Sequence, residues 1–449
     1  MMKNLKLQSL TLLLALGLAG TACDGFLDNS EPVDLLINEV AILTTSDAEA
    51  TLVGAYNRIS DFNAYGYGYT MNAELLTGTV RATGRGNLVF EDLQLLNASM
   101  SQINGRASGM WQKSYEVINS ANNVIDAIQT IQDEDIEAER GRLRGEALFL
   151  RAITHWELVR LYGSPTTGTG VPYITEPGRS ADVFPARETI DANYASIIAD
   201  LEEADQLLLA AGVSDVGRGT HWAAKAYLAK VYFQRGQNAQ AITYVDQIIA
   251  GGAFALNANY ADAFSPNEDD ETIFRMTSTG TDNVAGGLNE RFNPNVARGG
   301  VFGPSDSYVA ILTESAGDSR ADLLFEDNGG IFYAKYDQTQ FSPQVMNLPI
   351  VRYAEILLMK AEIDNDVDAI NDVRNRAGLG PLGAVTADAV FAERQKELAF
   401  EGDYFHNLKR LQLPINGIAW NDNRMTFPIP FVELEANDNL SQNPGYAGR

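Results

Sequence analysis

Cys23 is the residue whose surroundings most directly indicate a chemical modification. Lys3 and Lys6 precede an apolar run at residues 10–19, and small residues at positions 20–22 come directly before the cysteine. The apolar run is shorter than the roughly 20 residues that a bilayer-spanning helix needs, so it is typical of a cleaved signal. Cys23 is the only cysteine among 449 residues and therefore has no disulfide partner. We predict that its thiol carries lipid and anchors the chain to a membrane.

Few other side chains have the spacing of a catalytic or metal site. The three histidines fall in helical patterns, and none forms an HExxH pair. They are His155, His221 and His406. Asp364, Asp366 and Asp368 alternate as in a calcium loop, but no glycine or distal glutamate follows at the required spacing, so we expect an acidic helix N-terminus. We expect no catalytic residue, no cofactor and no metal, although abundant Asp and Glu leave a hydrolytic carboxylate pair open.

Aromatic side chains are the candidates for binding a sugar, because apolar sugar faces stack on rings while hydroxyl groups need polar partners. Trp420 lies in a loop, whereas the other three tryptophans fall in helical core patterns: Trp111, Trp156 and Trp222. Tyrosines alternate with glycine or alanine at Tyr65, Tyr67 and Tyr69, which is compatible with a binding surface or with the packed start of a helix. The scarcity of loop tryptophans leaves a peptide or a small charged glycan open as ligand.

Amphipathic helices are predicted for most of the chain, because apolar residues recur at spacings of three and four. They cover residues 110–131, 140–162, 187–201, 220–235, 237–250, 349–363, 368–379 and 392–410. In the last helix we expect Phe391, Leu398 and Ala399 to face inward and Gly402 to act as a C-cap. Its charged residues are expected to face outward: Glu393, Arg394, Lys396 and Glu397.

Small residues and a short glycine turn in residues 220–250 are typical of a tetratricopeptide-like helix pair. Such pairs bury their faces only by stacking, so several are expected. Residues 253–347 are rich in Gly, Pro, Asn and Asp, with strand-like pieces at 272–277 and 331–336. The predicted fold is mainly α, with tetratricopeptide-like helix pairs in a single large domain and loop-rich, short β insertions.

The composition limits the partners. The net charge is -26, and it becomes -28 once residues 1–22, which carry two lysines and no acidic residue, are removed. Such an acidic surface repels phosphates, so nucleic acid is not expected as a partner. The hydrophobic fraction of 45% is ample for a large core, and no low-complexity linker divides the chain.

Seven segments in order resemble the SusD/RagB family. They are RLRGEALFLRAITHWELVRLYG, FPARETIDANYASIIADLEEA, AAKAYLAKVYF, VRYAEILLMKAE, INDVRNRAGL, ERQKELAFEGDYFHNLKR and FPIPFVELEANDNLSQNPGY. The resemblance extends over nearly the whole chain after Cys23. It implies a lipid-anchored, surface-exposed protein of the Bacteroidetes outer membrane. Such a protein captures an oligosaccharide or peptide and passes it to a SusC-like TonB-dependent transporter, without catalysis.

The resemblance also implies a domain division and a ligand region. We expect a signal peptide at 1–22, a lipidated tether at 23–33 and a ligand-binding domain at 34–449. It places ligand contacts in two loop regions, whose candidate residues are Arg81, Arg85, Asn87, Arg291, Phe292, Arg298 and Phe302. The family's charged motif residues are expected to link helices: Arg151, Glu157, Arg374, Arg394, Glu397 and Glu401. Two alternatives stay open, a tetratricopeptide-like scaffold lipoprotein for envelope assembly and a surface glycoside hydrolase.

Overall fold

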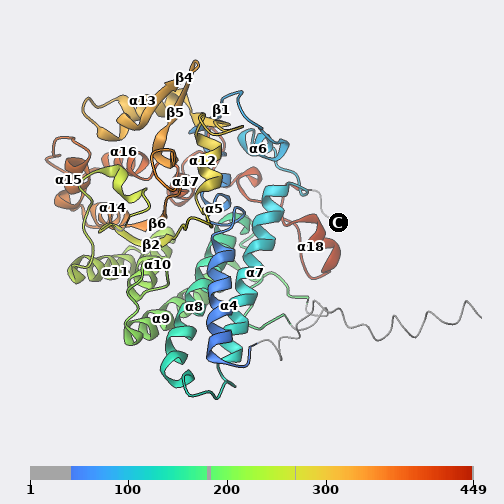
Figure 1. Ribbon diagram of the computed structural model, residues 1–449. Helices are drawn as coiled ribbons and strands as arrows, with labels where there is room; N and C mark the ends of the chain where they lie inside the picture. The colour runs from blue at the N-terminus through green and yellow to red at the C-terminus, as the bar shows by residue number, and fades with distance from the viewer. Residues whose placement is uncertain (1–41, 179–183, 268, 447–449) are drawn as a thin grey trace, which may run out of the picture. The chain divides into compact units, whose positions relative to one another are not determined.

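The computed structural model describes residues 42–178, 184–267 and 269–446. Cys23, the predicted signal peptide and the predicted tether lie outside these ranges. Residues 44–449 form one compact unit, in which helices dominate (Figure 1). Within the described ranges, no helix combines the length and apolar character that crossing a membrane requires.

The N-terminal helices form a stack of neighbours. Their bounds are α4 (Thr45–Ile59), α5 (Gly68–Glu74), α6 (Phe90–Leu96), α7 (Gly105–Ala127), α8 (Ile136–Tyr162), α9 (Ile190–Ala211), α10 (His221–Gln234) and α11 (Asn238–Gly251). In Figure 1, α4, α7, α8 and α9 run side by side, and α10 packs on both α9 and α11. Asn104, Thr189 and Thr220 cap α7, α9 and α10 by accepting backbone N–H bonds. The predicted helices in this half are confirmed, including the pair α10–α11.

The C-terminal half interleaves short strands with helices. Its helices are α12 (Gly286–Phe292), α13 (Asp306–Thr313), α14 (Tyr353–Asp364), α15 (Val367–Arg376), α16 (Ala387–Glu397), α17 (Asp403–Arg410) and α18 (Phe431–Ala436). The strands are β1 (Val80–Ala82), β2 (Thr272–Met276), β3 (Phe302–Pro304), β4 (Leu324–Asp327), β5 (Gly330–Tyr333) and β6 (Leu348–Arg352). They form two-stranded antiparallel sheets, in which β1 pairs with β3, β2 with β6 and β4 with β5. The strand-like pieces at 272–277 and 331–336 are thus found, the second continuing as a 3₁₀ turn at Ala334–Tyr336.

Two predicted helix boundaries are wrong. Residues 349–352 belong to strand β6, because Pro349 and its neighbours pair with β2, and the helix begins only at Tyr353. The predicted helix 392–410 is broken between Glu397 and Asp403. Phe400 and Gly402 have left-handed backbone φ values of 59° and 80°, which interrupt the helix, and Gly402 precedes α17 where we expected a C-cap.

The charged side chains of α16 also differ from their prediction, since Glu393, Arg394, Lys396 and Glu397 are all buried. Glu397 accepts bonds from Arg352 and Arg376, and Arg320 lies 3.2 Å from its second oxygen. These three arginines hold the pKa of Glu397 well below its usual range, although burial opposes the shift. The outward prediction failed because the cations that compensate this burial come from distant parts of the chain.

Several of the expected links between helices are present. Arg151 on α8 makes two 2.7 Å bonds to Asp200 on α9, Arg374 on α15 bonds Glu393 on α16 at 3.1 Å, and Arg394 on α16 lies 3.0 Å from Glu355 on α14. Glu157 instead pairs with Arg160 of its own helix. Asp366 caps α15, which confirms the helix N-terminus interpretation of the aspartate series. Trp222 is half-buried against His221, whereas we expected it in the core.

Candidate functional site

Strands β1 and β3 bring together the two loop regions in which ligand contacts were predicted. Arg81 pairs with Gly303 and Ala82 with Phe302, more than 200 positions apart in the sequence. The pairing continues through Thr83, whose backbone N–H donates to the carbonyl of Val301 at 3.0 Å. The segment after β1 therefore crosses directly over the segment before β3.

Gly86 allows the closest approach in this crossing. Its φ is 63°, and a Cβ atom there would lie 2.4 Å from the carbonyl oxygen of Arg298. A side chain at this position would meet both a left-handed backbone and a fixed carbonyl, so only glycine fits without displacement. Residues 85–87 and 298–301 thus form one continuous surface, called here the crossing-loop surface.

The arginines predicted for this region have different surroundings. Arg85 forms an ion pair with Asp327 and stacks 5.5 Å from the ring centre of Phe332. Arg81 donates to the carbonyl of Pro304 at 3.1 Å. Arg298 is exposed, with a φ of 64°, and it bonds to none of the residues that the structure describes. Of these three arginines, Arg298 is therefore the one whose guanidinium has no partner among the described residues.

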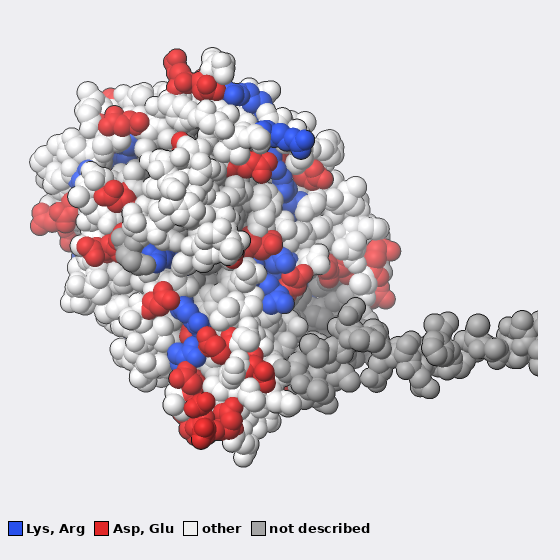
Figure 2. Space-filling view, in the orientation of Figure 1, with Lys and Arg blue, Asp and Glu red and all other residues white. Residues whose placement is uncertain are grey.

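Arg291 joins the crossing-loop surface to the buried layer below it. Its guanidinium donates to the carbonyl of Asn87 at 3.2 Å and lies 3.2 Å from the fully buried carboxylate of Asp92. Arg106 approaches the same carboxylate at 2.7 Å. Figure 2 shows basic side chains gathered over β1 and α6, on a molecule with far more acidic than basic residues.

Phe90 lies three residues beyond Asn87 of the crossing-loop surface, and the sequence analysis missed it as a candidate. It begins α6 and is 68% exposed, and Leu88 and Leu93 beside it are 38% and 41% exposed. Asn87, three positions earlier, is also exposed. An exposed aromatic ring can stack on the apolar face of a sugar, and an exposed amide can bond its hydroxyl groups. Phe90 could not be recognised from the sequence, because the apolar and acidic residues of LVFEDLQLL alternate as in a helix with one buried face.

The aromatic residues that we predicted as contacts are mostly buried. Tyr67 stacks on Phe62 with ring centres 4.6 Å apart, and Tyr69 bonds Ser114 at 2.6 Å. The tyrosine series thus forms the packed start of α5. Phe292 and Phe302 were predicted as ligand contacts. They are 2% and 0% exposed and pack near each other beneath the crossing-loop surface, so their rings are not open to a ligand.

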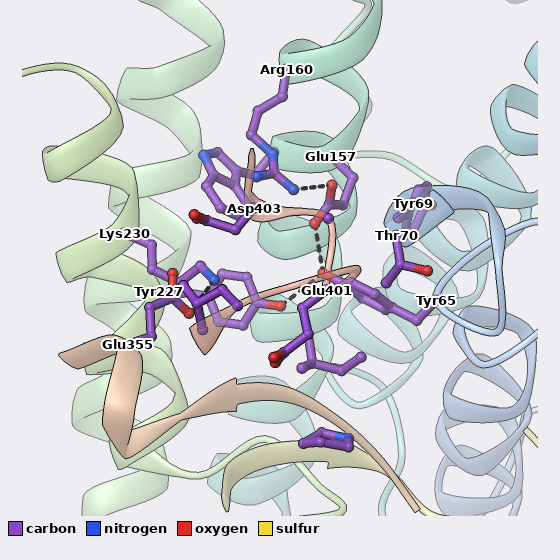
Figure 3. Close-up of a pocket in the computed structure, with 15 residues that line it drawn as sticks. Tyr65, Tyr69, Thr70, Glu157, Arg160, Tyr227, Lys230, Glu355, Glu401 and Asp403 are labelled. Carbon is purple, nitrogen blue, oxygen red and sulfur yellow. Dashed lines mark hydrogen bonds and ion pairs between the residues drawn. The ribbon is translucent and has the colours of Figure 1, made fainter. Parts of the chain in front are cut away.

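Tyr65 and Tyr69 line the small cavity in Figure 3. The hydroxyl of Tyr65 bonds Glu157 at 2.9 Å and Tyr227 at 2.7 Å, as the dashed lines show. The cavity measures about 30 Å³, which is room for about two water molecules. It is too small for a sugar ring, so these tyrosines organise the interior.

Three open hollows are larger. One, of about 430 Å³, contains Trp420 together with the ends of α8, α10 and α17. A second, of about 500 Å³, is lined by Asp262, Asp269 and Asp270 among other polar residues. A third, of about 480 Å³, lies between residues 254–258 and α15. Among the residues that the structure describes, no group of His, Cys, Asp and Glu is arranged to hold a metal ion.

The histidines are structural where they are buried. His155 accepts the backbone N–H of Ile174 at 3.1 Å on Nε2, while its Nδ1 lies 2.9 Å from the carbonyl of Arg151. Burial lowers the pKa of His155 to about 3, so the ring is neutral at physiological pH. Burial also lowers the pKa of His406. Neither ring reaches the crossing-loop surface.

Comparison with known proteins agrees with the fold. The chain is similar to SusD-like protein P2 of Formosa agariphila, with 27% identity covering 99% of this chain and all of that protein. A SusD-like protein of Bacteroides ovatus is 24% identical, covering 86% of this chain and 79% of the relative. The crystal structure of a SusD superfamily protein from Bacteroides thetaiotaomicron superposes with a TM-score of 0.80, at 26% identity, covering 89% of this chain and all of that one. A laminarin-binding SusD-like protein has the same fold, with a TM-score of 0.74 at 23% identity, covering 90% and 100% of the two chains.

Two family models match separate parts of the sequence. Residues 25–233 match a SusD-like family described as starch-binding and associating with the outer membrane. Residues 325–426 match the SusD family itself. These matches, the relatives aligned over nearly the whole chain and the shared fold agree with the seven ordered segments of the sequence: the chain belongs to the SusD/RagB family.

Proposed function

We propose that this protein is a lipid-anchored, cell-surface member of its family that binds a glycan without altering it and passes it to a SusC-like TonB-dependent transporter. Family membership supports outer-membrane association and a non-catalytic binding role. The anchoring proposal rests on Cys23 behind its short apolar run. A signal peptide at 1–22, a tether at 23–33 and a binding domain at 34–449 complete the proposed organisation.

One observation carries the choice of ligand region. The β1–β3 pairing and the close approach of Gly86 to Arg298 bring Asn87 and Arg298 together from segments about 200 residues apart, and the exposed Phe90 follows Asn87 by three residues. A ring for stacking, an amide and a guanidinium free of described partners match the apolar face and the hydroxyl groups of a sugar. Arg81 and Arg85 support this surface from beneath through their bonds to Pro304 and Asp327.

Isothermal titration with a panel of neutral oligosaccharides tests the proposal. For the oligosaccharide that binds, Phe90→Ala should weaken binding by about 1 to 2 kcal/mol, roughly five- to thirtyfold in Kd. Phe184→Ala is the matched control, because Phe184 is a 45% exposed phenylalanine in the segment before α9. Equal loss in both variants, or none in Phe90→Ala, would reject the crossing-loop surface.

The transfer role needs a second measurement. The protein taken gently from its native membrane should co-purify with a TonB-dependent barrel, and Phe90→Ala should not change that yield. Chromatography of the incubated oligosaccharide should show no shorter products. Hydrolysis would favour the glycosidase alternative, whereas partner proteins without any glycan binding would favour the scaffold alternative.

A further inference from the structure

The hollow that contains Trp420 has an unusual charge for this protein. It is formed where the ends of α8, α10 and α17 meet the loop after α17, and its volume is about 430 Å³. That volume falls within the range of small-molecule pockets. Among the described residues that line it, three are cationic and none is a carboxylate, in a chain of net charge -26. The cations are Arg235, Lys409 and Arg410.

The three cations differ in how far they are neutralised. Arg410 bonds Glu362 at 3.0 Å, and Arg235 bonds Asp191 at 2.8 Å. The Asp191 side chain is 83% exposed, so water screens that pair. Lys409 bonds only two backbone carbonyls among the described residues, those of Arg160 at 3.5 Å and Met425 at 3.2 Å. Its positive charge therefore has no carboxylate partner there.

Lys409 is half-buried, and partial burial is costly for an ammonium group without an anionic partner. Burial and the neighbouring Arg160 lower the pKa of Lys409 to about 8, so the group is still mostly charged at pH 7. An ammonium group has three donors, and the two carbonyls use two of them. A bound anion would accept the third bond and compensate the charge.

Besides the cations, the hollow contains an aromatic ring, that of Trp420. It is half-buried at the edge of the hollow, on the loop between α17 and α18. Tyr194, which also lines the hollow, is buried. The centre of its ring lies 4.7 Å from the guanidinium carbon of Arg235, and this contact holds the cation in place. An indole ring beside a group of cations can stack on a sugar ring whose charged substituent points toward Lys409.

We propose that this hollow is a second binding site, which takes a sugar bearing an anionic group, a carboxylate or a sulfate ester, with Trp420 against the ring and Lys409 and Arg235 at the anion. The choice of a sugar rests on the proposed function, whereas the anionic character rests on the hollow itself. The site is separate from the crossing-loop surface and shares no residue with it. Its ligand is distinguished from a neutral glycan by charge.

Isothermal titration with three probes tests the proposal. The probes are a trigalacturonate, a galactose disaccharide with a sulfate ester, and a neutral trisaccharide of glucose. We expect one or both acidic probes to bind, and to bind more weakly in 0.5 M salt because the cations become screened. Binding of trigalacturonate alone assigns a carboxylate, and binding of the sulfated probe alone assigns a sulfate ester. Both results support the proposal.

Two variants identify the site. Trp420→Ala and Arg235→Gln should each weaken the acidic probe at least fivefold and leave binding at the crossing-loop surface unchanged. Arg140→Gln is the control, because Arg140 is a similarly exposed arginine near the opposite end of α8. Acidic probes that do not bind, or that bind the variants as tightly as the wild type, overturn the proposal. Binding of a neutral glycan in that case would leave the proposed function intact.

Discussion

Arg352→Met should weaken the fold far more than loss of a surface ion pair. Arg352 lies at the end of β6, its side chain is fully buried, and all five N–H groups of the guanidinium are bonded. Its acceptors are Glu271 at 2.5 Å, the Glu397 carboxylate at 2.8 Å and carbonyl at 2.9 Å, and Glu401 at 2.7 and 2.9 Å. Methionine keeps an unbranched side chain that is shorter than that of arginine, and it removes every one of these bonds.

The structure bounds the size of the effect. Without Arg352, Glu271 keeps a 2.9 Å bond from Arg376, and Glu401 keeps a 2.6 Å bond from Lys335. The carboxylates are therefore left with fewer cations but not alone. Breaking a buried ion pair costs about 3 to 5 kcal/mol, and we expect the free energy of unfolding to fall by that amount.

Urea unfolding followed by circular dichroism measures this change. Arg140→Met is the control, because the Arg140–Glu137 pair lies on the surface with side chains 32% and 81% exposed. Such pairs contribute about 0 to 1 kcal/mol. If the two variants lose similar stability, the buried network does not hold β6 to α16, and the argument is wrong.

The pH dependence gives an independent check. Arg352 and Lys335 lower the pKa of Glu401 against the opposing effect of burial. A carboxyl group whose pKa is lower in the folded state contributes stability above its unfolded pKa, near 4.5, and that stability is lost as pH falls through the folded pKa. The difference between wild type and Arg352→Met should therefore be largest near neutral pH and shrink in acid.

Three further predictions concern other parts of the molecule. Gly86→Ala should abolish glycan binding at the crossing-loop surface, whereas Gly84→Ala, with a similar φ of 79° but open space around it, should retain it; equal binding would contradict the close approach. Burial raises the pKa of Glu74 to about 8, so the wild type should lose stability as the pH rises from 5 to 9, whereas Glu74→Gln should not. Over this range the variant should gain on the order of a few kcal/mol in free energy of unfolding relative to the wild type. The same pH dependence of the unfolding free energy in both proteins would refute this. Cys23→Ala should move the protein from the membrane to the soluble fraction, and retention after a high-salt wash would reject lipid anchoring.

Local patterns were sufficient for helices α7 to α11. The spacing of apolar residues and the caps at Thr189 and Thr220 lie within a few positions of the helix that they define, so α7 to α11 could be predicted from the sequence. The ordered charged and apolar segments were also sufficient to identify the family. The predicted region around Arg81 and Arg298 does come together, through the β1–β3 pairing.

Only the tertiary structure decided which side chains are exposed. Glu393 and Lys396 look like a solvated helix face, yet they are buried because Arg320 and Glu314 reach them from other segments. Phe90 looks like a core residue, yet its side chain is 68% exposed. Burial depends on partners far away in the sequence, whereas helix formation depends on neighbours along the chain. The sequence therefore determined the family and helices α7 to α11, and the packing of distant segments determined which side chains reach the surface.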